Sequence, residues 1–429
     1  MSTALSAPNP AVPTVSAAVV RERSWKTVIA FAVFLVLFVI LLIAVHRSGE
    51  ATFVLATSAD AFKLPDLVLP VAVTTWVCVI VAALITAAAA WLTWTRRRIP
   101  LWLVVAFIVV LVLAFLTWAS KGDSVPVVGL FSGALTLAVP LIYGALGGVI
   151  GERVGVVNIA IESQLLGGAF TAAVVATSTG SPFLGLIAAA FTGVVVGAVL
   201  AAFAIVYFVE QVIVGVVLNV LVAGLTTFFF SQVLQKDSAH LNSPPRFDRI
   251  PIPLLSDIPV IGPVLFRQTI LVYLMYIAVA AVYVAMFHTR WGLRLRAVGE
   301  HPQAADTVGI NVSRTRFLNV MLAGGIAGAG GTVFTVGTGI AFTQDMTAGA
   351  GYIALAAVIF GQWHPIKATL AALLFGLASS LQNILTVNQS PVPSEFMLML
   401  PYLVTIFVVA GVVGQSRPPA ADGVPYIKG

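Results

Sequence analysis

The stretch RAVGEHPQAADTVGI, from Arg296 to Ile310, decides how the rest of this chain is interpreted. It carries three charged residues and a proline, although only 9% of the chain is charged, and the segments on both sides are long and apolar. A short, soluble-looking helix between two membrane-like segments needs a physical reason. The surrounding segments indicate the class of protein, and the stretch itself indicates what such a protein does.

The composition is that of an integral membrane protein. The 429 residues are 60% hydrophobic with a mean hydropathy of +1.05, whereas soluble domains are about half apolar and about a quarter charged. Apolar runs of about 20 residues recur, which is the length of a membrane-crossing helix, and they are continuous rather than alternating as in a barrel. We therefore predict an all-α fold, a polytopic transmembrane helical bundle of about 10–12 spans. The expected spans cover residues 27–45, 68–92, 101–119, 129–149, 159–177, 183–207, 211–234, 269–287, 317–337, 348–363, 366–386 and 396–414.

Basic residues orient this bundle. The sequence pI of about 9.6 raises the question of nucleic acid, but Lys and Arg in a membrane protein mark cytoplasmic loops, so we expect no nucleic-acid partner. With the N-terminus inside, most of the 22 Lys and Arg residues fall in cytoplasmic segments. This arrangement predicts that both termini and the stretch 296–310 are cytoplasmic. The first run, 27–45, is longer than a signal-peptide core, so we interpret it as a retained anchor.

Composition also divides the chain into regions. Residues 1–26, rich in Ser, Ala and Pro, are expected to form a disordered cytoplasmic tail. Residues 27–120 form an additional transmembrane block that ends near the turn SKGDSVP. The main core covers 129–415, with the cytoplasmic helix near 296–310 inside it, and 416–429 form a second cytoplasmic tail.

The segment GALGGVIGERVGVVNIAIES, Gly144 to Ser163, combines glycines with intramembrane polar groups. The glycines recur at four-residue spacing, which lets helices pack closely. Asn158 and Glu162 lie further into the next span, where an unpaired carboxylate is costly, so Glu162 is a candidate functional residue. A structural hydrogen bond or ion pair between helices explains Glu162 nearly as well.

Two further segments carry polar residues within spans. Asn219 lies inside the run VEQVIVGVVLN, where it either bridges helices or contacts a polar substrate. The segment FTQDMTAGAGYIALAAVIFGQWHP, from Phe342, places Gln344 in a polar cluster before a short, glycine-containing run. Such runs are typical of broken helices that bind polar ligands.

The sequence offers no catalytic or metal-binding arrangement. The glycine-rich AGGIAGAGG, from Ala323, lies inside an apolar span without a following Lys-Ser/Thr, so helix packing explains it better than a phosphate-binding loop. With one cysteine (Cys78) and five histidines, neither a disulfide framework, a metal cluster nor a nucleophilic triad is expected. We predict that the chain is not an enzyme and binds no cofactor, so any ATP that drives it is hydrolysed by another subunit.

The opening stretch predicts a short capped helix. Pro302 suits the first helical turn, and Gly309 suits the position just after a helix end. The residues between them make about two turns, too few to be stable alone, so the helix must pack on something. Its charges exclude lipid, which leaves an aqueous protein partner or a solvated loop that only joins two spans.

Four segments together resemble a known family. RAVGEHPQAADTVGI, GERVGVVNIAIES, EQVIVGVVLN and GYIALAAVIFGQWHP look like ABC-transporter permeases of the branched-chain amino acid, ribose and simple-sugar group, closest to the nucleoside (guanosine-type) branch. The resemblance covers about residues 130–429 and implies a type II ABC importer-like permease. The first 120 residues have no counterpart in shorter members of that group.

The resemblance implies a role for the opening stretch and a set of partners. The stretch matches the coupling helix that docks on a cytoplasmic ABC ATPase, which binds ATP and Mg²⁺. A second related permease, in a heterodimer rather than a homodimer, and an extracytoplasmic substrate-binding lipoprotein complete the importer in the bacterial plasma membrane. His301 departs from the branch, which usually has Asn there. The matching residues are Arg296, Gly299, Glu300, Pro302, Ala304, Ala305, Gly309 and Ile310.

A nucleoside substrate presents a flat base and ribose hydroxyls, which suits amides and aromatic rings. The expected substrate path contains Asn158, Glu162, Asn219 and Gln344, with Phe230 and Trp363 as stacking surfaces. Two alternatives stay open: a permease for simple sugars, and an ion-coupled secondary transporter that works without an ATPase and uses Glu162.

Overall fold

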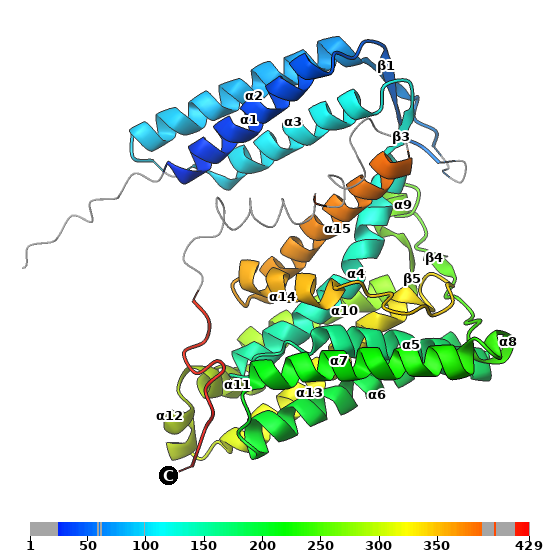
Figure 1. Cartoon of the computed structure of the whole chain (residues 1–429). Coiled ribbons are helices and arrows are strands. Elements are labelled where there is room, and N and C mark those ends of the chain that lie inside the picture. The colour runs from blue at the N-terminus through cyan, green and yellow to red at the C-terminus, as the bar shows by residue number, and fades with distance from the viewer. Residues whose placement is uncertain are drawn as a thin grey trace, which may run out of the picture.

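The computed structural model describes residues 25–57, 60, 62–97, 99–387, 399 and 417–428, and its fold is mostly helical (Figure 1). Long helices dominate because, in an apolar segment, a helix satisfies every backbone N–H and C=O internally. The helices are α1 (Lys26–Ala44), α2 (Val71–Trp94), α3 (Leu101–Ala119), α4 (Val127–Arg153), α5 (Ile161–Thr179), α6 (Pro182–Ala201), α7 (Gln211–Phe229), α8 (Ser238–Leu241), α9 (Ile261–Leu265), α10 (Ile270–His288), α11 (Arg290–Glu300), α12 (Pro302–Thr307), α13 (Val312–Gly331), α14 (Ala350–Phe360) and α15 (Pro365–Val387). Shorter helical turns follow α6, α7 and α13: η1 (Ala202–Val206), η2 (Phe230–Leu234) and η3 (Thr332–Phe334).

Within the described residues, 9 helices are long and apolar enough to cross a membrane. They occupy the places of nine of the predicted spans, with ends that differ by a few residues. Two other predicted spans are formed by α5, which begins with polar residues, and by the short apolar helix α14. The predicted span 396–414 and most of the predicted N-terminal tail lie outside the described residues. The chain is therefore a multi-pass, all-α membrane protein.

The N-terminal block is joined to the core by a small sheet that the sequence did not suggest. Strand β1 (Glu50–Val54) pairs antiparallel with β2 (Leu67–Pro70) and parallel with β3 (Ser124–Pro126), which runs directly into α4. Apolar residues of this block share one buried cluster with the start of α4 and the end of α15. Helices α1–α3 thus stand to one side of the core and contact it at the sheet end (Figure 1).

The helices of the core pack closely at glycines where they cross, as predicted from the sequence. Helices α6 and α13 pack so closely that a Cβ on Gly193 would lie 2.8 Å from the carbonyl carbon of Gly324. On α4, a Cβ on Gly144 would lie 2.9 Å from the Cβ of Ala354, and one on Gly148 would lie 2.7 Å from a methyl of Val358. Small residues at these positions let α4 contact α14 directly.

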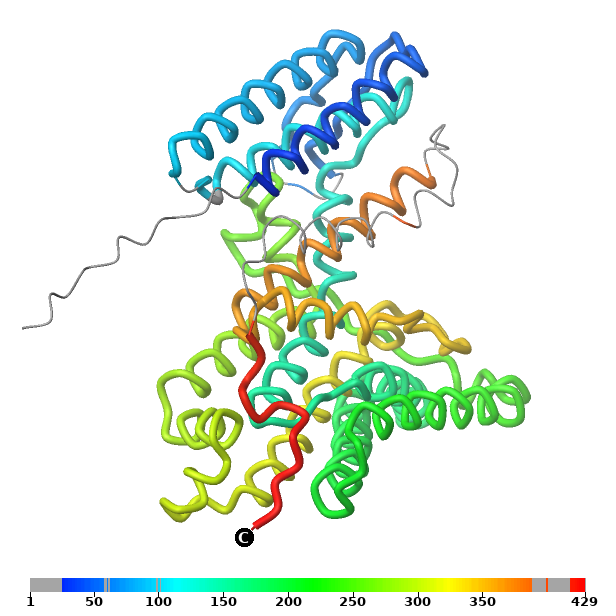
Figure 2. Tube along the Cα trace, turned by 60° about the vertical axis from the view of Figure 1, so that its left-hand side comes forward, coloured from blue at the N-terminus to red at the C-terminus, as the bar shows by residue number. Residues whose placement is uncertain are grey.

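The two ends of the bundle carry different structures. Helices α11 and α12 and the C-terminal residues 417–428 lie together at one end, which we call the α12 end (Figures 1 and 2). At the other end, the segment 235–269 forms α8, α9 and a two-stranded sheet of β4 (Arg249–Pro251) and β5 (Arg267–Thr269). None of the spans predicted from the sequence covers 235–268, and no helix was predicted over 290–300, where α11 lies.

Candidate functional site

Glu162 lies in the first turn of α5 and is held by the beginning of α14. Its side chain is only 7% exposed, and its carboxylate accepts hydrogen bonds from the Thr347 hydroxyl at 2.6 Å and the Gly349 amide at 3.0 Å. The Gly351 amide donates a third bond. Gly349 is the N-cap of α14, so the carboxylate satisfies amides that have no partner inside that helix. Glu162 therefore links the start of α5 to the beginning of α14.

Asn219, on α7, ties three elements together. Its side-chain oxygen accepts from the Ser163 amide at 3.0 Å, and its amide nitrogen donates to the Ile159 carbonyl at 3.0 Å and the Tyr352 hydroxyl at 3.1 Å. The side chain is 8% exposed. Asn219 therefore fixes α7 against the start of α5 and also orients the ring of Tyr352.

Asn158 belongs to the turn between α4 and α5. It is fully buried and exchanges side-chain hydrogen bonds with Gln164 at 3.2 and 3.4 Å. The same turn is held from α7, where Gln211 accepts a hydrogen bond from the Val157 amide at 2.8 Å. Asn158 thus lies beside Glu162 and Asn219, but all of its bonds serve the turn.

An exposed polar and aromatic face runs beside these residues. Tyr352 is 49% exposed although it lies within an apolar helix, and its hydroxyl is bonded to Asn219. Gln344 donates to the Ser231 hydroxyl at 3.0 Å, next to the half-buried Phe230. Phe230 packs edge-on against Phe342 with ring centroids 6.1 Å apart. We call Asn219, Phe230, Gln344 and Tyr352 the Tyr352 face.

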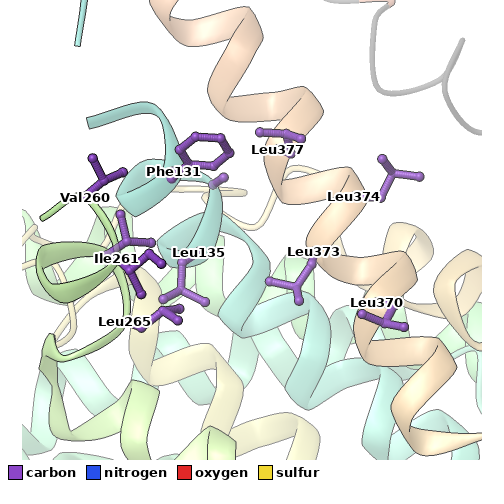
Figure 3. A pocket seen from close by; sticks show the side chains of 11 residues that line it. Phe131, Leu135, Val260, Ile261, Leu265, Leu370, Leu373, Leu374 and Leu377 are labelled. Atoms are coloured by element: carbon purple, nitrogen blue, oxygen red, sulfur yellow. The ribbon is translucent and has the colours of Figure 1, made fainter. Parts of the chain in front are cut away.

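Two cavities of about 540 Å³ each lie elsewhere and differ in chemistry. The first, between α4, α9 and α15, has only apolar side chains such as Phe131, Leu135 and Leu377 (Figure 3). It offers no hydrogen bond and does not suit a polar solute. The second lies near the β4–β5 sheet and is lined by charged residues such as Arg246 and Asp248 together with apolar residues such as Leu271.

Helix α11 presses against the end of α4. Thr289 caps α11 by accepting from the Gly292 amide at 3.2 Å. Gly299 is buried and faces the end of α4. A Cβ added to Gly299 would lie 2.9 Å from the carbonyl carbon of Arg153, and closer still to the carbonyl oxygen of Arg153. Arg296 turns back over the ring of Phe287, 5.1 Å from its centroid. These predicted coupling residues therefore contact their own chain.

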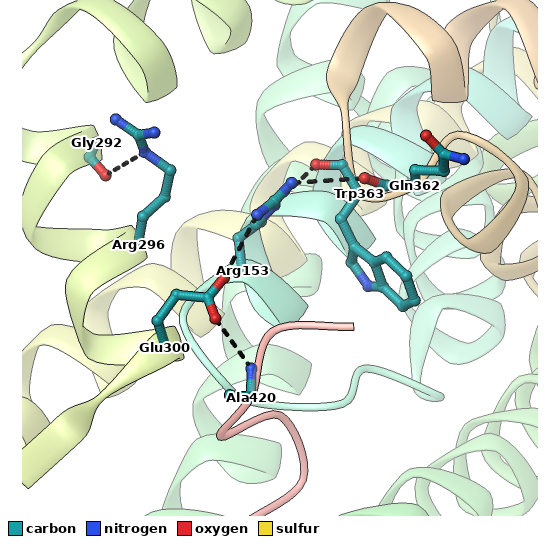
Figure 4. Close-up of polar contacts among 7 residues, drawn as sticks. All are labelled: Arg153, Gly292, Arg296, Glu300, Gln362, Trp363 and Ala420. Atoms are coloured by element: carbon teal, nitrogen blue, oxygen red, sulfur yellow. Dashed lines mark hydrogen bonds and ion pairs between the residues drawn. The ribbon is translucent and has the colours of Figure 1, made fainter. Parts of the chain in front are cut away.

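Arg153 connects α11 with the turn between α14 and α15 (Figure 4). Its guanidinium donates to the Trp363 carbonyl at 2.9 Å and lies 3.9 Å from the carboxylate of Glu300. Gln362 and Trp363 have φ values of 54° and 52°, a left-handed turn that is unusual for side chains of this size. The indole N–H of Trp363 donates to the buried carboxylate of Glu152. Trp363 thus belongs to the α12 end. Asn158, Glu162 and Asn219 lie around the start of α5, whereas Phe230 and Gln344 lie further along, near Ser231 and Phe342.

Helix α12 has the predicted caps. Pro302 opens the helix, and Gly309 follows its end with a φ of 85°. Ala305 is 3% exposed and Ile310 packs on the core, so α12 turns these two inward. Val308 is 76% exposed, and Ala304 and Gly309 also face out. An apolar side chain so exposed beside charged neighbours is available for contact with another protein.

At the α12 end, the Asp422 and His364 side chains have shifted pKa values. Burial raises the pKa of the Asp422 carboxyl to about 7, although Arg316 and the Gly423 amide act in the opposite direction. Burial lowers the pKa of His364, and the positive charges of Lys367 and Arg153 lower it further. His364 is therefore neutral at pH 7, and Asp422 is close to half-protonated.

Comparisons with known proteins identify the family. A family model described as the branched-chain amino acid transport system / permease component matches residues 130–409. The chain belongs to this permease family. The guanosine ABC transporter permease protein NupQ of Bacillus subtilis is 42% identical over 304 residues, which are 69% of this permease and 95% of NupQ. The nucleoside ABC transporter permease protein NupC of Lactococcus lactis is 39% identical over 305 residues, which are 68% of this permease and 95% of NupC.

A sugar-transport relative also matches. The putative glucose ABC transporter permease protein TsgC13 of Haloferax volcanii is 37% identical over 258 residues, which are 59% of this permease and 77% of TsgC13. A second guanosine ABC transporter permease protein of Bacillus subtilis, NupP, is 26% identical over 66% of this permease and 83% of its own length. No solved structure matches. The family match begins after the N-terminal block.

Several residues of the site were not anticipated. Tyr352 could have been noticed, because it is the one polar-tipped residue in the run GYIALAAVIF. The bonds of Thr347 to Glu162 and of Trp363 to Glu152 join residues that are 185 and 211 positions apart, so no local pattern predicts them. In the described part of the chain, no group of three or more His, Cys, Asp and Glu residues is placed to hold a metal ion.

Proposed function

We propose that this permease is one membrane subunit of an ATP-driven importer that carries nucleosides into a bacterial cell across the plasma membrane. Its N- and C-termini and the α12 end face the cytoplasm, where most basic residues of the connecting segments lie. A separate ATPase binds ATP and Mg²⁺ and docks on α12. A second, related permease and an extracytoplasmic lipoprotein that binds the substrate complete the importer.

The relatives support the substrate and the partners. NupQ and NupC, named for guanosine and nucleoside transport, align with this chain over 95% of their lengths, so the whole of each shares the core described above. Bacillus subtilis has both NupQ and NupP named as permeases for guanosine, which supports a pair of different permeases. Sugar transport is the second candidate, favoured by the match to TsgC13 over a shorter region.

The exposed surface of α12 is the observation that carries the proposal. A helix of 6 residues cannot be stable alone, and α12 is held in place by its packing on α11 and the core. Its outer surface presents Val308, Ala304 and Gly309 to solvent, and the chain has no phosphate-binding loop of its own. A cytoplasmic ATPase that docks here would move α11 and, through Gly299 and Arg153, the end of α4.

The Tyr352 face is the proposed substrate path. Its aromatic rings suit a flat base, and the exposed Gln344 amide and Tyr352 hydroxyl suit ribose hydroxyls and base edges, while the buried Asn219 amide holds the Tyr352 hydroxyl in place. Packing of a second permease against this face would enclose it and exclude lipid. Glu162 and Asn158 then support the path by fixing α14 and the α4–α5 turn rather than by contacting the substrate.

Co-purification of the ATPase with permease variants tests the docking surface. We expect that Val308→Asp abolishes co-purification of the ATPase, because a carboxylate replaces the exposed apolar contact. Leu254→Asp is the matched control, since Leu254 is 84% exposed at the opposite end of the bundle. Normal co-purification with Val308→Asp would contradict docking on α12.

Uptake measurements separate the two energy sources and the two substrate classes. ATP-driven import continues when a protonophore collapses the ion gradient, whereas an ion-coupled transporter stops. Excess unlabelled guanosine should compete with labelled nucleoside, and excess glucose should not. Competition by glucose alone would favour the sugar permease.

A further inference from the structure

The C-terminal segment Pro419–Lys428, which we call the strap, folds back across the α12 end (Figures 1 and 2). It follows the last predicted span and could have ended as a free tail. Instead, its residues contact α11, α12, α13 and the turn after α4. The strap is therefore part of the folded α12 end.

The strap satisfies the last turn of α11. The Ala421 amide donates to the Gly299 carbonyl at 2.9 Å, and the Ala420 amide donates to the Glu300 carboxylate at 3.3 Å (Figure 4). The carbonyls in the last turn of a helix lack partners within that helix, so an outside donor stabilises its end. The same Glu300 carboxylate also lies 3.9 Å from the guanidinium of Arg153. The strap therefore closes a connection from α11 to the end of α4.

A buried arginine anchors the strap to α13. Arg316 is only 2% exposed, and its guanidinium donates to the Val424 carbonyl at 2.8 Å and the Ala421 carbonyl at 3.3 Å. Leaving a buried guanidinium without these acceptors is costly, so the strap and Arg316 stabilise each other. Next to this anchor, a Cβ on Gly423 would lie 3.4 Å from a methyl of Val157, in the turn after α4.

The end of the strap reaches α12. The ammonium of Lys428 lies 3.9 Å from the carboxylate of Asp306, but the Lys428 side chain is 75% exposed, so this pair contributes little. The hydrogen bonds of Ala420, Ala421 and Val424 instead join the strap to Gly299 and Glu300 in α11 and to Arg316 in α13.

We infer that the strap positions the α11–α12 pair, so that force applied by the ATPase to α12 reaches both α4 and α13. This inference rests on the proposed function. Without the strap, the chain would still insert into the membrane and still present Val308. The α11–α12 pair would then move independently of α13, and ATP turnover would proceed without substrate movement.

Two variants and one control test the strap. Ala421→Pro removes the amide that donates to Gly299, and a chain ending at residue 416 removes the strap entirely. Pro418→Ala is the matched control, because Pro418 is exposed and lies just before the strap. The purified permease gives one readout, hydrogen–deuterium exchange of α11 and α12, which needs neither ATPase nor substrate. The reconstituted importer gives the other, nucleoside molecules imported per ATP hydrolysed.

We expect exchange in α11 and α12 to rise about fivefold in Ala421→Pro, the size of effect that one lost hydrogen bond produces, and more in the truncated chain. Exchange in α5 and α6, to which the strap makes no hydrogen bond or ion pair in the described residues, should stay unchanged, which shows that the bundle is folded. Import per ATP should fall by about fivefold or more in both variants, and Pro418→Ala should match the wild type.

The inference is overturned if exchange in α11 and α12 is unchanged in both variants, or if import per ATP stays normal while exchange rises. A wild-type protein that imports without ATP would refute the proposed function instead. The exchange measurement would still show in that case whether the strap holds α11, so the two failures are distinguishable.

Discussion

The contact between α11 and α4 predicts a graded response to substitution of two glycines. In Gly299→Ala, the new methyl would lie 2.9 Å from the carbonyl carbon of Arg153, where ordinary contact begins at 3.4 Å, so α11 must move away by at least about 0.5 Å. Overpacking of this kind costs about 1–3 kcal/mol. At 1.4 kcal/mol per factor of ten, the ratio of seated to displaced α11 falls by about 5- to 150-fold, and we expect import per ATP to fall by about tenfold.

Gly309→Ala is the comparison for Gly299→Ala, because Gly309 directly follows α12 in the same α11–α12 segment. Gly309 has a φ of 85° but no neighbour within 4 Å of an added Cβ, so only backbone strain of about 1 kcal/mol opposes the change. Import per ATP should therefore fall less than in Gly299→Ala, by about fivefold. The assay is labelled-nucleoside uptake and phosphate release in the same proteoliposomes, with ATPase co-purification as the assembly control. Wild-type import by Gly299→Ala, or a larger loss in Gly309→Ala, would refute this reasoning.

Three other perturbations probe the remaining contacts. Glu162→Gln replaces one of the two accepting oxygens by an NH2 group, so one of the Gly349 and Gly351 amides loses its acceptor, and the unfolding free energy should fall by about 1–3 kcal/mol, measured by thermal unfolding in detergent; an unchanged midpoint would contradict the role of Glu162 at the start of α14. Tyr352→Ala should raise the uptake half-saturation concentration about tenfold, because it removes the exposed ring, whereas Tyr352→Phe keeps the ring and should change it about threefold or less; equal effects would remove the ring from the path. Because burial raises the pKa of Asp422 to about 7 in the docked strap, the protonated carboxyl stabilises docking at low pH, and this stabilisation is lost as the pH rises through about 7. Strap amides, corrected for intrinsic exchange rates, should therefore lose protection as the pH rises from about 4 to 7 and change little above pH 7, and Asp422→Asn should remove that dependence.

The spans could be predicted from the sequence because hydropathy and helix length are local properties. Continuous apolar runs leave the backbone no alternative to a helix in lipid, so the predicted positions of α1–α7, α10 and α13–α15 agree with the structure within a few residues. Close packing through Gly144, Gly148 and Gly324 was also predictable, since small residues at four-residue spacing have one main use in a membrane. The caps of α12 were equally local, because Pro302 and Gly309 each have a strong positional preference.

The parts that depend on distant contacts could not be predicted. Polarity alone marked Glu162 and Asn219, but only the fold shows that their partners are the start of α14 and the Tyr352 hydroxyl. Trp363 looked like a stacking surface because an aromatic ring in a polar turn suits a flat ligand, yet its indole bonds to Glu152 at the α12 end. The strap carries little local signal: Ala420 and Ala421 act through backbone amides, which every residue except proline has.

The most direct test of the central claim is guanosine uptake by proteoliposomes that contain this permease, its partner permease and the ATPase, with the binding lipoprotein outside. Uptake is measured with internal ATP and a protonophore, for the wild type and for Gly299→Ala. We expect ATP-dependent uptake that resists the protonophore, and ATP hydrolysis in Gly299→Ala that persists while import falls about tenfold. Uptake that stops with the protonophore and continues without ATP would contradict it.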